Sequence, residues 1–243
     1  MTYLPDREFL IDVAMGLYDN MSIVNKFGAN PDVDSGSVPE DVWGYGGVYG
    51  FYPTAAEGME IVSTSASDTE DIFIQGLDSS WNVISETKTL NGQTAVALDN
   101  DYIRVFRAYN TGANDLVGNV SVRMDSGAAT VAAYIIAAEN QTQQTIYTIP
   151  AGKTGYFLQG YVAMVDAGAS RTCRMIYQVR PFGGVFQIKG EVGLTTGGNT
   201  HWQYRYQGPP PIPEKSDIRI RVTEASSADM KMVGGYDILL VDN

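Results

Sequence analysis

The sequence is divided into short runs of strand-forming residues, and this pattern constrains the fold more than any other feature. From Trp43 onward, β-branched, aromatic and aliphatic runs alternate with turns rich in Ser, Asp, Asn and Gly, a spacing typical of β-sandwiches. Only 18% of the 243 residues are charged and 26 are glycine, which disfavours a helix bundle. We therefore expect a mainly β protein.

The pattern predicts two β-sandwich, jelly-roll-like domains preceded by a short helix and an extended N-terminal arm. The expected segments are the helix and arm over residues 1–42, an acidic β-sandwich over 43–127, and a second β-sandwich over 128–243. The helix is predicted over residues 7–17, where apolar residues share one helical face. Glycine and proline interrupt residues 25–40, which predicts an extended arm lying on its own domain or on a neighbouring chain.

Two further features concern the second sandwich. A Pro-Ala-Gly-Lys turn at residues 150–153 separates two apolar runs, which predicts a hairpin between them. The run at residues 238–241 is apolar on both faces, as is typical of a central strand. Truncation at the C-terminus should therefore unfold this domain.

Charge is distributed unevenly and bears on the partners. Residues 1–130 carry 19 acidic and 6 basic residues, whereas residues 131–243 carry 9 and 10. The acidic part repels phosphate backbones, so we expect no nucleic-acid partner. The longest apolar run spans residues 131–138, far short of the roughly 20 residues that span a bilayer. We therefore expect no membrane partner, and the start of the chain lacks the pattern of a signal peptide.

Residues suited to catalysis are scarce. His201 is the single histidine and Cys173 the single cysteine. A Ser-His-Asp triad would therefore depend on His201, and the sequence has no Gly-x-Ser-x-Gly motif, while a zinc site would need mostly carboxylate ligands. Nucleotide-binding glycine motifs are also missing from the sequence. We expect no enzyme activity, no cofactor and no metal.

Two alternatives involve acidic residues. Asn30, Asp32, Asp34 and Asp41 match positions one, three, five and twelve of a calcium loop, but Ser35 replaces the usual glycine and the last ligand is not Glu. A weak calcium site therefore stays open beside an ordinary acidic arm. Glycan chemistry is the second alternative, with these carboxylates and aromatic rings: Asp68, Glu70, Asp71, Trp43 and Trp81. Sugar binding without hydrolysis is the stronger form of it.

Several stretches resemble a family of virion structural proteins of tailed bacteriophages, with matches from about residue 23 to the C-terminus. The stretches are VNKFGANPDV (24–33), EDVW (40–43), GLD (76–78), ISET (84–87), LNG (90–92), ENQT (139–142), YTIPAGKT (147–154), RPFG (180–183), PEKSDIR (213–219) and DILLVDN (237–243). The resemblance implies a non-enzymatic particle component without catalytic residues. A Gly/Thr-rich insert associated with the family is missing after residue 69, which puts any binding role of that loop in doubt.

The expected function is a decoration or cement protein in the virion, which binds the major capsid protein on the outside of the head and bridges capsomers as a homo-oligomer. The predicted neighbour contacts are residues 23–42 and the following aromatic cluster: Asn25, Lys26, Phe27, Asn30, Trp43, Tyr45, Tyr49, Phe51 and Tyr52. An internal core is the alternative role of these aromatic residues. A neck or tail position is a second structural alternative. Deletion of residues 1–42 should leave a folded remainder.

Overall fold

The chain is mainly β with one short helix, as the sequence predicts. The computed structural model describes residues 8–126, 130–165 and 170–243. Helix α1 spans Phe9–Ala14, which is shorter than the predicted range of 7–17; residue 7 lies outside the described residues. The chain turns after Met15 instead of continuing the helix, so the apolar residues at positions 17 and 18 lie beyond its end.

Two antiparallel sheets form what we call the large unit. In strand order, the first sheet contains β1 (Met21–Val33), β17 (Met230–Asp242), β11 (Lys153–Met164) and β14 (His201–Arg205), and β15 (Pro211–Ile212) also pairs with β11. The second contains β10 (Tyr147–Thr148), β16 (Asp217–Ala225), β12 (Thr172–Arg180) and β13 (Gln187–Thr195), and β2 (Glu40–Asp41) also pairs with β16. Apolar residues from both sheets share one core.

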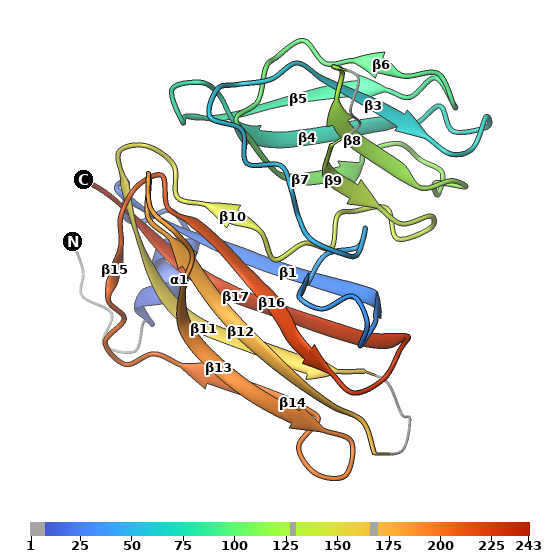
Figure 1. The fold of residues 1–243 in the computed structure, drawn as a ribbon. Coiled ribbons are helices and arrows are strands. Elements are labelled where there is room, and N and C mark those ends of the chain that lie inside the picture. The colour runs from blue at the N-terminus through green and yellow to red at the C-terminus, as the bar shows by residue number, and fades with distance from the viewer. Residues whose placement is uncertain (1–7, 127–129, 166–169) are drawn as a thin grey trace.

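Two smaller sheets form the small unit. One contains β6 (Val96–Ala97), β3 (Met59–Ser63), β8 (Val120–Met124) and β9 (Val131–Ile135), and the other contains β5 (Val83–Thr89), β4 (Asp71–Leu77) and β7 (Arg104–Asn110). A second core lies between them. These strands gather in one part of the molecule, and β1 and β10–β17 gather in the other (Figure 1).

The fold differs from two separate jelly rolls. The strands form four distinct sheets, and the large unit takes strands from both ends of the chain. The predicted boundary at 127/128 lies before β9, which pairs with β8 of the small unit. The boundary at 42/43 follows β2, which pairs with β16 of the large unit. Side chains of the small unit, including Phe106, also contribute to the core of the large unit.

The structure corrects the prediction of an extended arm, because most of that segment forms a regular strand. Residues 21–33 form β1, which pairs with β17 along almost its whole length. The register shifts between Asn30 and Val33, so Pro31, which has no amide hydrogen, falls where the ladder is interrupted. At Gly28 a Cβ atom would lie 2.7 Å from the Val42 carbonyl oxygen. The glycine and the proline therefore serve strand packing here and do not prevent it.

The structure also corrects the prediction of a hairpin around the turn at residues 150–153. It is present, but β10 before it belongs to the second sheet and β11 after it belongs to the first. The turn therefore carries the chain between the two layers of the large unit and does not join a hairpin. The prediction of a central C-terminal strand is confirmed, since β17 lies between β1 and β11.

Candidate functional site

A buried ion-pair network connects the two units. Arg104 begins β7 of the small unit and Asp217 begins β16 of the large unit. The Arg104 Nε–H donates to Asp217 Oδ1 over 2.8 Å, and Nη2 donates to Oδ2 over 3.2 Å. The two side chains are only 6% and 3% exposed. Removing one partner of such a buried pair typically costs about 3–5 kcal/mol, so this contact fixes the units together.

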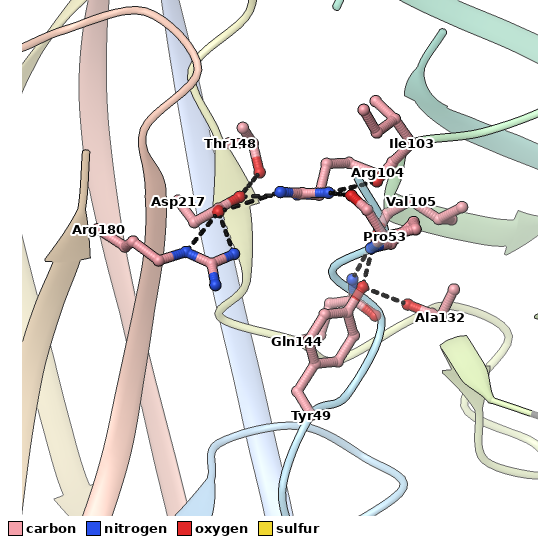
Figure 2. Close-up of polar contacts among 10 residues, drawn as sticks. All are labelled: Tyr49, Pro53, Ile103, Arg104, Val105, Ala132, Gln144, Thr148, Arg180 and Asp217. Atoms are coloured by element: carbon pink, nitrogen blue, oxygen red, sulfur yellow. Dashed lines mark hydrogen bonds and ion pairs between the residues drawn. The ribbon is translucent and has the colours of Figure 1, made fainter. Parts of the chain in front are cut away.

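The network is completed by further donors to the same carboxylate (Figure 2). The Thr148 hydroxyl donates to Asp217 Oδ1 over 2.7 Å, and Arg180 Nε donates to Oδ2 over 2.9 Å. The remaining Arg104 nitrogen, Nη1, donates to the carbonyl oxygens of Pro53 and Ile103. All three guanidinium nitrogens of Arg104 therefore donate hydrogen bonds, whereas Nη1 of Arg180 has no acceptor in this network.

Backbone geometry places Arg104 in this position. The pairing of β4 with β7 shifts register between Gln75, opposite Arg107, and Gly76, opposite Val105, so the irregularity lies at Phe106, two residues after the start of β7. At Gly76 a Cβ atom would lie only 2.1 Å from the Arg104 carbonyl oxygen. Only glycine permits this close approach, so Gly76 is required for the irregular pairing beside Arg104.

Aromatic rings surround the guanidinium groups. Tyr52 lies between Arg104 and Arg180, whose Cζ atoms are 5.2 Å and 4.3 Å from its ring centroid. Phe186 lies against Arg180 and Arg219 in the same way, at 4.7 Å and 3.6 Å. Such cation–π contacts favour a desolvated cation. Burial raises the pKa of Tyr52 far above its usual value, so the ring stays neutral between the arginines.

A second buried carboxylate joins the N-terminal strands to β16. Asp41 accepts hydrogen bonds from Arg221 Nε and Nη2 over 2.7 Å and 2.8 Å, and its Oδ2 accepts from the Tyr49 amide over 2.8 Å. Arg219 lies 3.7 Å away. Burial lowers the pKa of Arg219, and the charge of Asp41 opposes that effect. Asp41 thus forms a hydrogen-bonded ion pair with Arg221 and lies close to Arg219.

The calcium-loop alternative is not matched by the geometry. The Asn30 amide donates to Glu40 and to the Asp41 carbonyl oxygen, and the Asp41 carboxylate is occupied by arginine. Asp32 and Asp34 lie instead near Asp229, with oxygen atoms within 4.8 Å of one another. The charges of Asp34 and Asp229, together with desolvation, raise the pKa of Asp32. The four counted residues therefore do not converge on one point.

The predicted contact residues differ in exposure. Trp43, Tyr49 and Phe51 are buried in the core of the small unit, which is the alternative role that the sequence leaves open. Tyr52 is half-buried, and Tyr45 is 54% exposed, with its ring against Trp43.

The strand residues among the predicted contacts also divide. Asn25 is exposed and donates to Asp237 over 2.5 Å, and Phe27 is half-buried. Lys26 and Asn30 are buried. The Lys26 ammonium donates to the Phe106 carbonyl oxygen, and burial together with the charge of Arg107 lowers its pKa to about 7. Burial within this chain thus accounts for Lys26 and Asn30, while Asn25 and Tyr45 remain accessible.

The acidic residues and the cysteine that the sequence offers for catalysis take part in hydrogen bonds or are buried. Burial would raise the pKa of Asp68, but hydrogen bonds from the Ser63 hydroxyl and from the backbone amides of Val117 and Gly118 outweigh it and lower the pKa. Glu70 and Asp71 accept hydrogen bonds from neighbouring loops and strands. Burial also raises the pKa of the Cys173 thiol to about 11, so it stays protonated near neutral pH.

An exposed apolar segment was missed by the sequence reasoning. We call residues 9–18, which contain α1 and the turn after it, the N-terminal apolar segment. Its large side chains are 39–64% exposed, and they are Phe9, Leu10, Ile11, Met15, Leu17 and Tyr18. Val13 is the buried residue of α1. The sequence places apolar residues on one helical face, and most of these side chains are exposed to solvent.

Comparisons with known proteins give only distant likenesses. No family model matches the sequence, and no curated protein matches it. The VP2 subviral particle of infectious bursal disease virus is 8% identical, with 92% of this chain and 72% of that chain covered and a TM-score of 0.27. The PBSX exported protein XepA is 10% identical, with 89% and 86% covered and a TM-score of 0.22. Likenesses at this level carry no inference about function.

No helix among the described residues has the length and apolar character needed to cross a bilayer.

Proposed function

We propose that this protein is a non-enzymatic structural component of a tailed-phage virion, specifically a decoration or cement protein that binds the major capsid protein and bridges capsomers. The resemblance of its sequence stretches to virion structural proteins motivates the proposal. The observation that carries it is the N-terminal apolar segment, which exposes six large apolar side chains within ten residues. Exposed apolar clusters of this kind mark surfaces that bind other proteins.

The segment is suited to binding a neighbour because little of it packs on its own chain. A six-residue helix is too short to be stable in isolation, and α1 has no side-chain hydrogen bond at its N-cap. Fully burying a large apolar side chain contributes about 1.5–3 kcal/mol. Contact with a capsid surface or a second copy would therefore stabilise the segment, and repetition over a symmetric shell multiplies a modest affinity.

The rest of the molecule supplies a rigid support for such a contact. The long pairing of β1 with β17 begins only a few residues after the segment, and the buried Arg104–Asp217 pair joins the two units. A contact made at the N-terminus is therefore transmitted to a molecule whose parts are held together.

The test is incorporation into virions by a variant of the segment. Phe9→Ser, Ile11→Ser and Met15→Ser together should leave the fold intact, because all three side chains are exposed. Particles lacking this protein would be incubated with each purified form, washed, and assayed by gel densitometry against the major head protein. The proposal expects strong binding of the wild type and loss of binding by the triple variant.

A matched control has two exposed valines of the small unit changed, Val83→Ser and Val117→Ser, which are 47% and 67% exposed. This control should bind like the wild type. Equal binding by the segment variant would contradict the proposed contact. A copy number far below that of the head protein would instead favour a neck or tail position.

A further inference from the structure

A cleft lies where the two units meet. The residues that line it come from both units, and they are Tyr52, Pro53, Thr54, Trp81, Arg104, Arg180, Pro181, Phe182, Gly183, Gly184, Lys215 and Asp217. Its volume is about 350 Å³, which is in the range of small-molecule sites. The cleft is built on the ion-pair network, so its walls are held in place by the same contacts that join the units.

Positive charge exceeds negative charge in this cleft. The described lining residues include three cationic side chains, those of Arg104, Arg180 and Lys215, but only one carboxylate, that of Asp217. The surplus occurs in a chain whose net charge is −12. A cationic cleft in an acidic protein focuses attraction on an anionic ligand.

The donors of this cleft are not all engaged. Arg104 donates through Nε, Nη1 and Nη2 to Asp217 and to two carbonyl oxygens. Arg180 uses Nε and Nη2 on Asp217, which leaves Nη1 for a ligand. The Lys215 ammonium lies 5.6 Å from the Phe182 ring centroid, and no carboxylate among the described residues pairs with it. The Arg180 Nη1 group and the Lys215 ammonium, which belong to residues lining the same cleft, can therefore donate hydrogen bonds to a ligand.

An exposed aromatic ring forms the rim. Phe182 is 65% exposed, although it lies in the turn between β12 and β13 beside this charged cleft. The buried Trp81 ring supports it with an edge contact at a centroid distance of 5.5 Å. The exposed part of this supported ring can stack against the apolar face of a sugar, and an inorganic anion would make no use of it.

We propose that this cleft binds a carboxylated saccharide of the hexuronic acid type. The carboxylate accepts hydrogen bonds from Arg180 Nη1 and Lys215 Nζ, and the pyranose ring stacks on Phe182. Charge-assisted hydrogen bonds supply most of the affinity, and the aromatic ring selects a sugar over a bare anion. This inference is independent of the proposed structural role in the virion, because the cleft and the N-terminal apolar segment share no residue.

The experiment is isothermal titration of the full-length protein with three probes: digalacturonic acid, the neutral disaccharide galactobiose and inorganic phosphate. Binding of digalacturonic acid at least about tenfold tighter than either other probe is expected, and it should weaken with added salt. Equal binding of phosphate would overturn the saccharide assignment. Absence of binding by digalacturonic acid would overturn the proposal altogether.

Two variants and matched controls test the named contacts. Lys215→Gln should weaken digalacturonate binding about tenfold, whereas Lys189→Gln, which removes the same charge from an exposed position on β13, should not change it. Phe182→Ala should weaken binding as well, whereas Phe9→Ala removes an exposed ring elsewhere and should not. Unchanged affinity in both cleft variants would contradict the site.

The outcomes remain separable from those of the virion experiment. Lys215→Gln should still bind to particles at wild-type occupancy, and the triple serine variant of the N-terminal apolar segment should still bind digalacturonate. Loss of both properties in either variant, with the fold retained, would contradict two separate surfaces.

Discussion

Two neighbouring segments of the N-terminal region use their residues in opposite ways. The N-terminal apolar segment exposes most of its large apolar side chains, whereas β1 and β2, which follow it, bury charged and polar ones: Lys26, Asn30, Glu40 and Asp41. Both segments belong to the region predicted as helix and arm. Side-chain polarity alone therefore does not indicate which part of this region lies inside.

The two segments differ in burial because they differ in the strands and hydrogen-bonding groups that lie next to them. β1 has an antiparallel neighbour in β17, and each buried polar group has a counterpart, such as Arg221 for Asp41 and the Asp34 and Gly47 amides for Glu40. Buried charge is tolerated when it is paired and hydrogen-bonded. The N-terminal apolar segment packs mainly on β1, with Val13 as the buried residue of its helix. It is thus the segment of this pair that is free to bind another molecule.

The largest expected effect comes from comparing two deletions, one of the N-terminal apolar segment alone and one of this segment together with β1 and β2. Removal of residues 1–17 should leave a folded protein, because β1 and its pairing with β17 stay intact. Removal of residues 1–42 should prevent folding, in contrast to the sequence-based expectation of a folded remainder, because it deletes an edge strand, two buried core valines (Val33 and Val42) and the partner of two arginines. Circular dichroism and thermal melting would compare the two. A cooperative melt of the shorter remainder would contradict the role of β1.

A single carboxylate tests the same contrast at a smaller scale. Asp41→Ala should lower the free energy of unfolding by about 3–5 kcal/mol, because Arg219 and Arg221 would be left without their buried counter-charge. Asp19→Ala removes an exposed carboxylate directly after the N-terminal apolar segment and should change stability by less than about 0.5 kcal/mol. Urea unfolding measures both, and similar values for the two variants would argue against the buried network.

Lys26 should make the stability of the strand region depend on pH. Its pKa is about 7 in the folded chain, against about 10.4 when unfolded. Between these values the unfolded chain binds more protons, so stability rises with pH across this window; below about pH 7 the full cost of burying the charge remains.

Lys26→Met removes that dependence. The variant should gain stability relative to the wild type near pH 6, by on the order of 1–2 kcal/mol, and the gain should shrink towards pH 10. Urea titrations at both pH values provide the measurement. A stability difference that is the same at both values would show that Lys26 is not desolvated as described.

The smallest effect concerns the exposed carboxylates near the end of β1. The pKa of Asp32 is raised in the folded chain, mainly by Asp34, so its charge opposes folding at neutral pH and this penalty is relieved as the pH falls through the folded pKa. Asp32→Asn should therefore raise the melting temperature slightly at neutral pH and not in acid. Added calcium should not raise the melting temperature of the wild type. A clear rise would support a calcium site in this region.

The sequence predicts the local features better than the long-range pairings. Alternating runs predicted strands, and the doubly apolar run at residues 238–241 predicted a central strand, because these patterns depend on which faces are buried. The conformation of residues 25–33 depends on a partner about 200 residues away in β17. Periodicity carries no information about that distance, so glycine and proline suggested an arm.

The candidate sites were harder to predict for the same reason. Arg104, Arg180 and Lys215 are far apart in the sequence, and only the contact between the units brings them to one cleft. The RPFG stretch at 180–183 carries part of the family resemblance, and it also contributes both Arg180 and Phe182 to the cleft. The aromatic residues following Trp43 were predicted as contacts or core, and burial assigns Trp43, Tyr49 and Phe51 to the core.

Incorporation into virions tests the central claim most directly. Purified particles would be assayed by quantitative gel densitometry for this protein, in the wild type and in the triple serine variant of the N-terminal apolar segment. We predict a wild-type band in constant ratio to the major head protein and a strongly reduced band for the variant. A purified virion from which the wild-type band is missing would contradict the account.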